Sequence, residues 1–262
     1  MHNPTHTNSE TLISKYRPTN LTEMVLPWQH GLTKALDFLS NPYPEAFLFY
    51  GCAGLGKTSL ARIMAHAAAG DPFSVRYLSG PDLDSNTVRD IAAASYHPPL
   101  FGKYYAYVVD EADQTPRGGQ IRLLSLLENL GHTVWIFTSN ESMEEFEPRF
   151  VSRVKPLLFS KQGIMEPATE WLLSIAQKEG ISLSKTGAAN LIRESNNNLR
   201  MALQALELKG ADQKKRHQIV PSEARKTVPE PALNDLRAVN KPGANASWFH
   251  GDIRITSWCG GR

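Results

Sequence analysis

The sequence predicts an α/β fold, in which a parallel sheet carries helices on both faces and a small all-helical lid domain follows. Between residues 46 and 159, short apolar segments of strand length alternate with segments of helical periodicity, which is typical of a parallel sheet with helical crossovers. From Ser160 onward, only amphipathic helical segments follow. The length of 262 residues and the hydrophobic fraction of 41% allow one medium domain and a small one in an ordinary soluble protein.

Five apolar segments are expected to form the strands of this sheet. They are Ala46–Tyr50, Val75–Leu78, Tyr104–Asp110, Thr133–Ser139 and Lys155–Phe159. The segments between them predict helices over Thr58–Ala65, Asn86–Ser95 and Gln120–Leu130, the last with leucines at helical spacing. This alternation indicates that helices cover both faces of the sheet.

The remaining residues are expected to form a lid and a tail. Helices are predicted over Pro167–Glu179, Ser184–Glu194 and Leu199–Leu208. The expected domains are therefore 1–159 (α/β), 160–210 (lid) and 211–262 (a basic, disordered tail). The tail has nine Lys or Arg against five Asp or Glu, a balance of +4, so the other residues carry −2 of the net charge of +2. Such a tail attracts nucleic acid in some proteins, but the lack of aromatic or glycine–arginine repeats favours simple disorder.

Cysteine content and hydropathy argue against several classes of protein. Cys52 and Cys259 lie far apart and have no neighbouring metal ligands, so we expect neither a disulfide framework nor a zinc site. No apolar segment approaches membrane-spanning length, and residues 1–10 lack the apolar core of a signal peptide. We therefore expect a cytoplasmic protein, in the host-cell cytoplasm if it is phage-encoded, with no membrane partner.

Residues 51–58, Gly-Cys-Ala-Gly-Leu-Gly-Lys-Thr, fit the P-loop pattern G-x-x-x-x-G-K-[ST]. A strand precedes them and a helix follows, so the positive end of the helix dipole would face bound phosphates. A chance match to a glycine-rich turn is the alternative, and these flanks argue against it. Lys57 would reach the β- and γ-phosphates and Thr58 would ligate Mg²⁺. The residues expected to bind the nucleotide here are Gly51, Cys52, Ala53, Gly54, Leu55, Gly56, Lys57, Thr58 and Ser59.

Polar residues at the ends of the third and fourth predicted strands complete a hydrolytic pattern. Asp110 would hold Mg²⁺ and Glu111 would polarise the attacking water. A pair of helix-capping carboxylates is the alternative, but their position one βα unit after the P-loop favours catalysis. Asn140 would orient the water near the γ-phosphate. An asparagine after a strand is more often a turn residue, but its order after the two acids reverses that preference.

Two arginines are candidates for stabilising the charge that develops on the γ-phosphate. Arg153 precedes the last strand, and Arg200 begins the last predicted helix. A lone arginine in a loop is usually only solvated, so neither assignment stands without further support.

Six motifs follow one another in an informative order. They are Lys15-Tyr16-Arg17-Pro18 with Leu21 and Val25-Leu26-Pro27; Leu48-Phe49-Tyr50-Gly51 before the P-loop; Asp110-Glu111-Ala112-Asp113 with Gln120; Thr138-Ser139-Asn140; Ser152-Arg153; and Asn198-Leu199-Arg200-Met201-Ala202-Leu203. Over residues 12–208 this chain resembles the clamp-loader subunits of the AAA+ ATPases, namely the replication factor C small subunit and the large subunit of T4-type phage loaders. The Lys-Tyr-Arg-Pro opening separates clamp loaders from other AAA+ proteins.

The resemblance implies roles for individual residues and a set of partners. Tyr16, Arg17 and Pro18 would line the adenine and ribose side of ATP, and Glu111 would be the catalytic base. Asn140 would be sensor 1, Arg200 sensor 2, and Arg153 an arginine finger offered to the ATP of the neighbouring subunit. The implied cofactors are ATP and Mg²⁺. The implied partners are other clamp-loader subunits in a pentameric spiral, a ring-shaped sliding clamp and primer–template DNA.

Two departures from the family leave alternatives open. Relatives carry a helical collar after the lid, whereas the 52 residues (262 − 210) after residue 210 lack helical periodicity. Leu124 and Ser125 stand where relatives commonly place arginines that face DNA. The expected function is an ATP-hydrolysing clamp-loader subunit in DNA replication. The alternatives are a nucleotide-binding assembly or regulatory AAA+ protein that does not load clamps, and another AAA+ remodeller such as a branch-migration motor.

Overall fold

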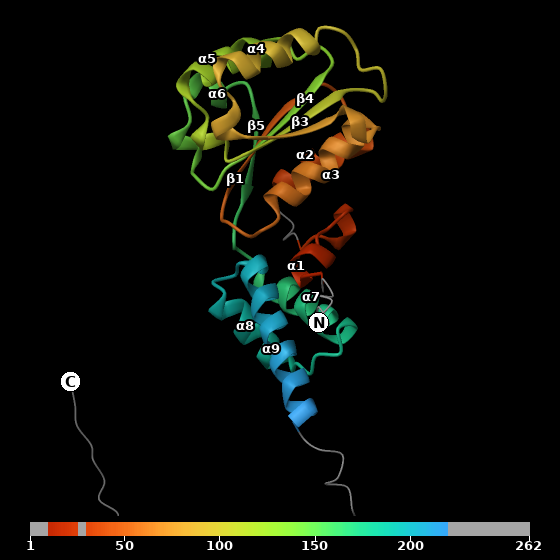
Figure 1. Ribbon diagram of the computed structural model, residues 1–262. Coiled ribbons are helices and arrows are strands. Elements are labelled where there is room, and N and C mark those ends of the chain that lie inside the picture. The colour runs from red at the N-terminus through yellow and green to blue at the C-terminus, as the bar shows by residue number, and fades with distance from the viewer. Residues whose placement is uncertain (1–9, 26–29, 220–262) are drawn as a thin grey trace, which may run out of the picture. The chain divides into compact units, whose positions relative to one another are not determined.

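The computed structural model describes residues 10–25 and 30–219. A five-stranded parallel sheet with the order β2-β3-β4-β1-β5 forms its centre (Figure 1). The strands are β1 (Ala46–Gly51), β2 (Val75–Ser79), β3 (Tyr105–Asp110), β4 (Thr133–Thr138) and β5 (Lys155–Phe159). The predicted α/β class is confirmed, and each observed strand end lies within one residue of its predicted position.

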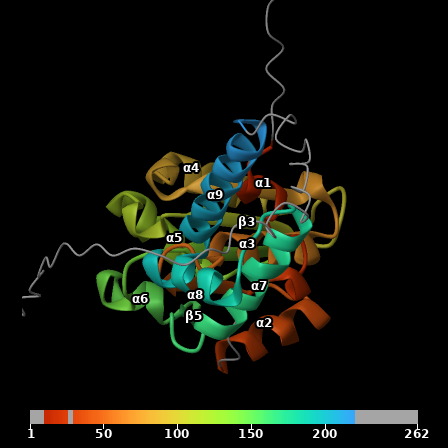
Figure 2. The same cartoon turned by 90° about the horizontal axis from the view of Figure 1, so that it is seen from below.

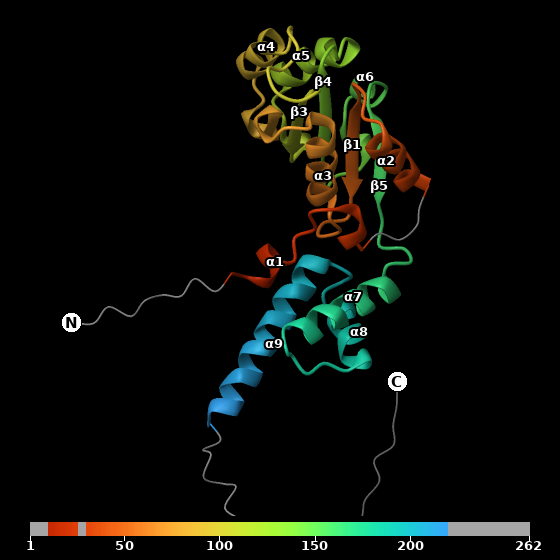
Figure 3. The same cartoon turned by 90° about the vertical axis from the view of Figure 1, so that its right-hand side faces the viewer.

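Helices cover both faces of the sheet because alternate residues of each strand point to opposite sides. On β1, Phe47 and Phe49 belong to an apolar cluster with α2 (His30–Ser40) and α3 (Lys57–Ala69). Leu48, between them, belongs to a second cluster with α4 (Ser85–Ala94) and α5 (Arg117–Glu128). Figures 1 and 3 show these two helical layers on either side of the strands.

The order of the strands brings three loops together at one edge of the sheet. β4 pairs in parallel with both β3 and β1, so the carboxyl ends of these three strands are neighbours. The segments that follow them contain the P-loop, the Asp110–Glu111 pair and Asn140. In open α/β sheets, ligands bind at this carboxyl edge.

Three helices follow the sheet, as predicted: α7 (Met165–Lys178), α8 (Lys185–Glu194) and α9 (Leu199–Ile219) (Figure 2). Leu172, Ile192 and Leu206 bury their side chains completely where these helices pack together. The chain therefore changes from strands to helices after residue 160, while its division into domains there stays a prediction.

The end of the last helix corrects the sequence analysis. We predicted a helix that ends at Leu208 and a tail that begins at residue 211, whereas α9 continues to Ile219. Gln213 explains part of the difference, because its side-chain amide accepts from the backbone N–H of Ser182 (3.0 Å) and donates to the carbonyl of Ser182 (2.9 Å). Gly210 does not break the helix, and a Cβ there would lie 2.7 Å from Ile181. Residues 220–262 of the predicted tail lie outside the described residues.

Several elements, most of them short, were not predicted. They are α1 (Leu12–Lys15), α2, α6 (Pro148–Val151) and the 3₁₀ turns Leu21–Glu23, Pro72–Ser74, Gly80–Asp82, Ala112–Gln114 and Met143–Glu145. Helices of four residues are too short to show a periodicity, whereas α2 has Ala35, Phe38 and Leu39 at helical spacing. Leu26 and Pro27 of the opening motif lie outside the described residues.

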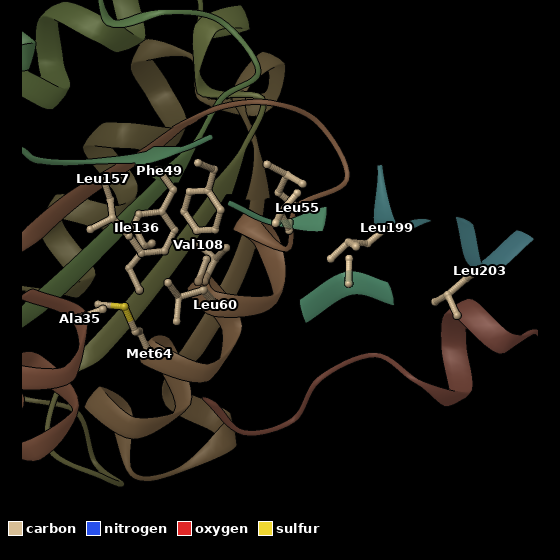
Figure 4. Close-up of a cluster of buried hydrophobic side chains, with 14 of the residues drawn as sticks. Ala35, Phe49, Leu55, Leu60, Met64, Val108, Ile136, Leu157, Leu199 and Leu203 are labelled. Atoms are coloured by element: carbon tan, nitrogen blue, oxygen red, sulfur yellow. The ribbon is translucent and has the colours of Figure 1, made fainter. Parts of the chain in front are cut away.

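The apolar cluster on the α2–α3 side of the sheet reaches the P-loop at Leu55 and α9 at Leu199 and Leu203 (Figure 4). It therefore connects the sheet with the elements around the candidate site. Among the helices that the structure describes, none is long and apolar enough to span a bilayer.

Candidate nucleotide-binding site

Two adjoining cavities lie at the carboxyl edge of the sheet. The polar cavity, of about 240 Å³, is lined by Ala53, Gly54, Gly56, Lys57, Thr58, Ser59, Asp110, Glu111, Thr138, Ser139, Asn140 and Arg200. The second is mainly apolar and shares Gly54, Gly56, Ser59 and Arg200 with the first. Every predicted site residue lines one of the two cavities except Gly51, Cys52 and Arg153.

The P-loop turns sharply from β1 into α3. Gly54 and Gly56 have φ values of +75° and +92°, which residues with a Cβ rarely adopt. Gly56 is also the N-cap of α3 and provides no side-chain cap. The first N–H groups of α3 are therefore not capped by a side chain. Together with the positive end of the helix dipole, they make the start of α3 suited to binding an anion.

Lys57 is held at the centre of the loop and is only 6% exposed. Its Nζ donates to the carbonyls of Gly51 and Cys52 and to Oδ1 of Asn140, each over 2.8 Å. Burial is the main cause that lowers the pKa of Lys57 to about 8; the nearby charge of Arg200 also lowers it, whereas Cys52 and the carboxylates of Asp110 and Asp113 raise it. A bound phosphate would offset this loss by stabilising the ammonium form.

Asp110 ends β3 beside the hydroxyl that follows the P-loop lysine. Its Oδ1 accepts hydrogen bonds from Thr58 Oγ1 (2.9 Å) and from Thr138 Oγ1 (2.6 Å). Carboxylate and hydroxyl oxygens are hard ligands of the kind that Mg²⁺ prefers, so these residues fit the ion. Within the described ranges, no three His, Cys, Asp or Glu side chains are grouped so that they could hold a metal ion by themselves.

Glu111 has an unusual backbone conformation. Its φ of 56° and ψ of 46° lie in the left-handed region, which costs a residue with a Cβ about 1–3 kcal/mol. Gly80 packs against it so closely that a Cβ on the glycine would lie 2.0 Å from the Glu111 carbonyl oxygen. This turn lets Glu111 line the polar cavity.

Asn140 lies beside the P-loop because it follows β4, the neighbour of β1. Its Oδ1 accepts from Lys57 Nζ. The preceding turn is held by Ser139, whose Oγ donates to Asp113 Oδ1 (2.7 Å) and accepts from the backbone N–H of Glu141 (2.9 Å). The structure thus joins the segments after β1, β3 and β4 in one network of hydrogen bonds.

Arg200 reaches both cavities from the second residue of α9. The start of this helix contacts the P-loop, because the backbone N–H of Leu199 donates to the Gly54 carbonyl over 3.2 Å. Asn198 Oδ1 accepts from the N–H of Met201 (3.1 Å), as an N-cap does. We named Asn198 and Thr138 only as members of motifs and predicted no role for either; an asparagine just before a helical run was the available signal for the former.

The apolar cavity is formed by the opening motif and the lid. Tyr16, Arg17 and Pro18 line it with Met24, Val25 and Trp171, among others. The Tyr16 hydroxyl donates to Glu179 Oε1 over 2.7 Å. Burial, together with this carboxylate, raises the pKa of Tyr16 to about 12, so the phenol stays neutral. The cavity has the apolar walls that suit a planar base, next to the polar cavity that suits its phosphates.

Arg153 lies at neither cavity. Its guanidinium pairs with Glu128 at the end of α5 and donates to the carbonyl of Arg149. The structure therefore does not bring Arg153 to the P-loop of its own chain.

Comparisons with known proteins show which families and proteins this chain is similar to. Residues 47–161 match the family described as ATPase family associated with various cellular activities (AAA). A putative replication factor C small subunit of Acanthamoeba polyphaga mimivirus is 27% identical, over 77% of this chain and 64% of that protein. The replication factor C small subunit of Natronomonas pharaonis is 30% identical, over 76% and 62% respectively. The chain thus spans less than two thirds of the length of these relatives.

A solved structure provides a comparison of the fold. The RuvB Holliday junction branch migration motor of Thermotoga maritima superposes with a TM-score of 0.61 at 18% identity, over 73% of this chain and 64% of that one. At this level of identity the similarity concerns the fold alone.

Proposed function

We propose that this chain hydrolyses ATP with Mg²⁺, because residues 47–161 match the AAA family of ATPases and a longer stretch is similar to replication factor C small subunits. One observation carries the proposal. A lysine, a hydroxyl and a carboxylate from different segments, Lys57, Thr58 and Asp110, line one polar cavity beside an open helix N-terminus. This is the set of groups that P-loop hydrolases use on a nucleoside triphosphate.

Each residue around the polar cavity would have a separate role in hydrolysis. The backbone N–H groups of the P-loop and Lys57 Nζ would bind the β- and γ-phosphates, with Lys57 leaving its present carbonyl partners. Thr58 and Asp110 would hold the Mg²⁺, which neutralises charge on the phosphate oxygens. Glu111 would accept a proton from the attacking water, and Asn140 would orient that water.

Two arginines would act on the γ-phosphate from different sides. Arg200 lines the polar cavity of its own chain, so it would act in cis. Arg153 lies away from that cavity and would act in trans, on the ATP of a neighbouring subunit. The opening motif would hold the adenine, with Tyr16 on the wall of the apolar cavity.

The role that ATP hydrolysis would serve is clamp loading in DNA replication, as the relatives named replication factor C small subunit indicate. The proposed partners are other clamp-loader subunits, a sliding clamp and primer–template DNA. An exposed apolar surface formed by Phe73, Leu100 and Phe101 supports a protein partner, since these side chains are 87%, 93% and 62% exposed. A hydrogen bond joins the two segments that carry these side chains, because Ser74 Oγ donates to the Phe101 carbonyl over 2.5 Å.

Two alternatives remain as competing functions. A branch-migration motor shares the fold, but the sequence relatives and the Lys-Tyr-Arg-Pro opening favour a clamp loader. An assembly or regulatory protein that binds ATP without loading clamps would keep the nucleotide site but show no stimulation by clamp and DNA.

The test of ATP hydrolysis uses two variants that separate binding from turnover. We expect Lys57→Ala to abolish both the binding of a fluorescent ATP analogue and phosphate release. We expect Glu111→Gln to bind the analogue normally and to lose at least a hundredfold in kcat, since general-base catalysis contributes at least that much. Glu144→Gln, on an exposed residue outside both cavities, is the control and keeps full activity. Full turnover in Glu111→Gln would remove this residue from the role of base.

A further inference from the structure

We propose that Glu128 is a positioning residue for Arg153 and holds its guanidinium in the orientation presented to the ATP of a neighbouring subunit. The inference rests on the proposed function, because Arg153 has a nucleotide to act on only where two chains meet. It adds a residue that the sequence analysis did not single out and that lies outside both cavities.

The contacts of Arg153 fix the plane of its guanidinium. Nε donates to Glu128 Oε1 over 3.1 Å, and Nη2 pairs with the same oxygen. Nη1 donates to the backbone carbonyl of Arg149 over 2.6 Å. Nη1 also donates to Ser152 Oγ over 3.4 Å. Arginine has five N–H donors in a rigid fork, so these contacts leave one N–H, on Nη2, for a phosphate oxygen. These contacts therefore orient the guanidinium and still leave it able to donate to a phosphate.

Glu128 is an unexpected residue for the position that it occupies. It is the last residue of α5, where the negative end of the helix dipole makes a carboxylate unfavourable. The positive charge of Arg153 offsets this. The helix itself is anchored by Leu123, Leu124 and Leu127, which are buried against the sheet, so Glu128 is presented from a rigid element.

Folding stability does not account for the pair. The side chain of Glu128 is 59% exposed and that of Arg153 is 24% exposed, and ion pairs with an exposed partner contribute little to stability. What the pair does provide is order in a long side chain, which otherwise samples many rotamers. An arginine that is already ordered loses less entropy when it binds the γ-phosphate in the transition state. We therefore expect the ion pair to raise kcat.

The test measures turnover of the full chain under conditions in which light scattering shows the assembled state. We expect Glu128→Ala to lower kcat at least fivefold with KM for ATP unchanged, and Glu128→Gln to lower it less because the amide oxygen still accepts. In a chain that already carries Arg153→Ala, adding Glu128→Ala should cause no further loss. Glu147→Gln is the matched control, because it removes the neighbouring ion pair with Arg149 and should leave kcat unchanged.

The outcomes separate this inference from the proposed function. If Arg153→Ala lowers kcat but Glu128→Ala does not, or raises it, Glu128 is not a positioning residue. An equal loss from Glu128→Ala with and without Arg153 would also overturn the inference, since Glu128 would then act independently. If Arg153→Ala does not change kcat in the assembled protein, the proposed role of Arg153 in trans is wrong. The role of Glu128 is then wrong as well. Matching thermal unfolding midpoints exclude misfolding as the cause.

Discussion

Single residues at this site have chemistry that depends on their surroundings, and Lys57 is the clearest case. Its ammonium group is buried and held by two backbone carbonyls and Asn140. Desolvation lowers its pKa to about 8, so part of the population is neutral in mildly alkaline solution. A nucleotide would therefore bind to a lysine whose charge it helps to restore.

This pKa predicts how nucleotide affinity changes with pH. A lysine with a lowered pKa is charged below that value and neutral above it, and only the charged form pairs with phosphate. We expect the affinity for an ATP analogue to fall about tenfold from pH 7 to pH 9. Fluorescence titration at constant ionic strength measures this. Lys57→Arg stays charged, so its weaker affinity should vary much less over that range; an equally steep fall in that variant would assign the effect to another group.

For Glu111, the sequence predicts the position of the residue but not its backbone conformation. Its place after an apolar strand and one βα unit beyond the P-loop was readable in the sequence. Its left-handed backbone was not, because this conformation is rare for glutamate and depends on the missing side chain of Gly80, 31 positions earlier (111 − 80). Such tertiary contacts leave no local pattern.

Among the elements, the P-loop and α9 contact one another directly. Leu199 donates to the Gly54 carbonyl, and a Cβ on Gly54 would lie 1.9 Å from Asn198 Oδ1. The cap of α9 therefore occupies the space that a side chain at Gly54 would need. Because Arg200 follows that cap, the position of this arginine depends on the P-loop.

Two glycines with similar backbones test this contact. Gly54 and Gly70 have φ values of +75° and +72°, but nothing lies within 4 Å of a Cβ added to Gly70. We expect each change to alanine to cost about 1–2 kcal/mol of folding stability from the left-handed backbone. Only Gly54→Ala should also weaken nucleotide binding, at least tenfold, because it displaces Asn198. Chemical denaturation and analogue titration measure the two effects.

A second change distinguishes the contact from a direct effect on phosphate. Asn198→Gly removes the obstructing side chain, and glycine at an N-cap costs only a few tenths of a kcal/mol. We expect Gly54→Ala with Asn198→Gly to recover part of the lost affinity. Equal losses of affinity in Gly54→Ala and Gly70→Ala, or no recovery in the double variant, would contradict the coupling.

The elements also divide into those that sequence patterns predict and those that they do not. Apolar runs of strand length located all five strands. The central strands β1, β3 and β4 are buried along most of their length, whereas the edge strands β2 and β5 are partly exposed. The continuation of α9 to Ile219 was missed, because it depends on Gln213 bonding to Ser182 in another part of the lid. No role was predicted for Asn198 for a similar reason: its contact with Gly54 joins residues 144 positions apart (198 − 54).

At the scale of the whole molecule, one chain brings together the residues proposed for phosphate binding and hydrolysis, with the exception of the proposed arginine finger. Lys57, Asp110, Glu111 and Arg200 line one cavity, whereas Arg153 does not line it and pairs with Glu128. Such a distribution fits an ATPase in which one subunit completes the site of the next. The relatives extend beyond the span that this chain covers, so its assembly has to be measured on the chain itself.

Light scattering coupled to size-exclusion chromatography, with and without a non-hydrolysable ATP analogue and Mg²⁺, tests this arrangement most directly. We expect the mass of the wild-type chain to rise from a monomer to an oligomer when the analogue is added, because the bound γ-phosphate provides an acceptor for the Arg153 of a neighbour. Lys57→Ala should stay monomeric throughout. A wild-type chain that binds the analogue to saturation and still elutes as a monomer would contradict a site shared between subunits.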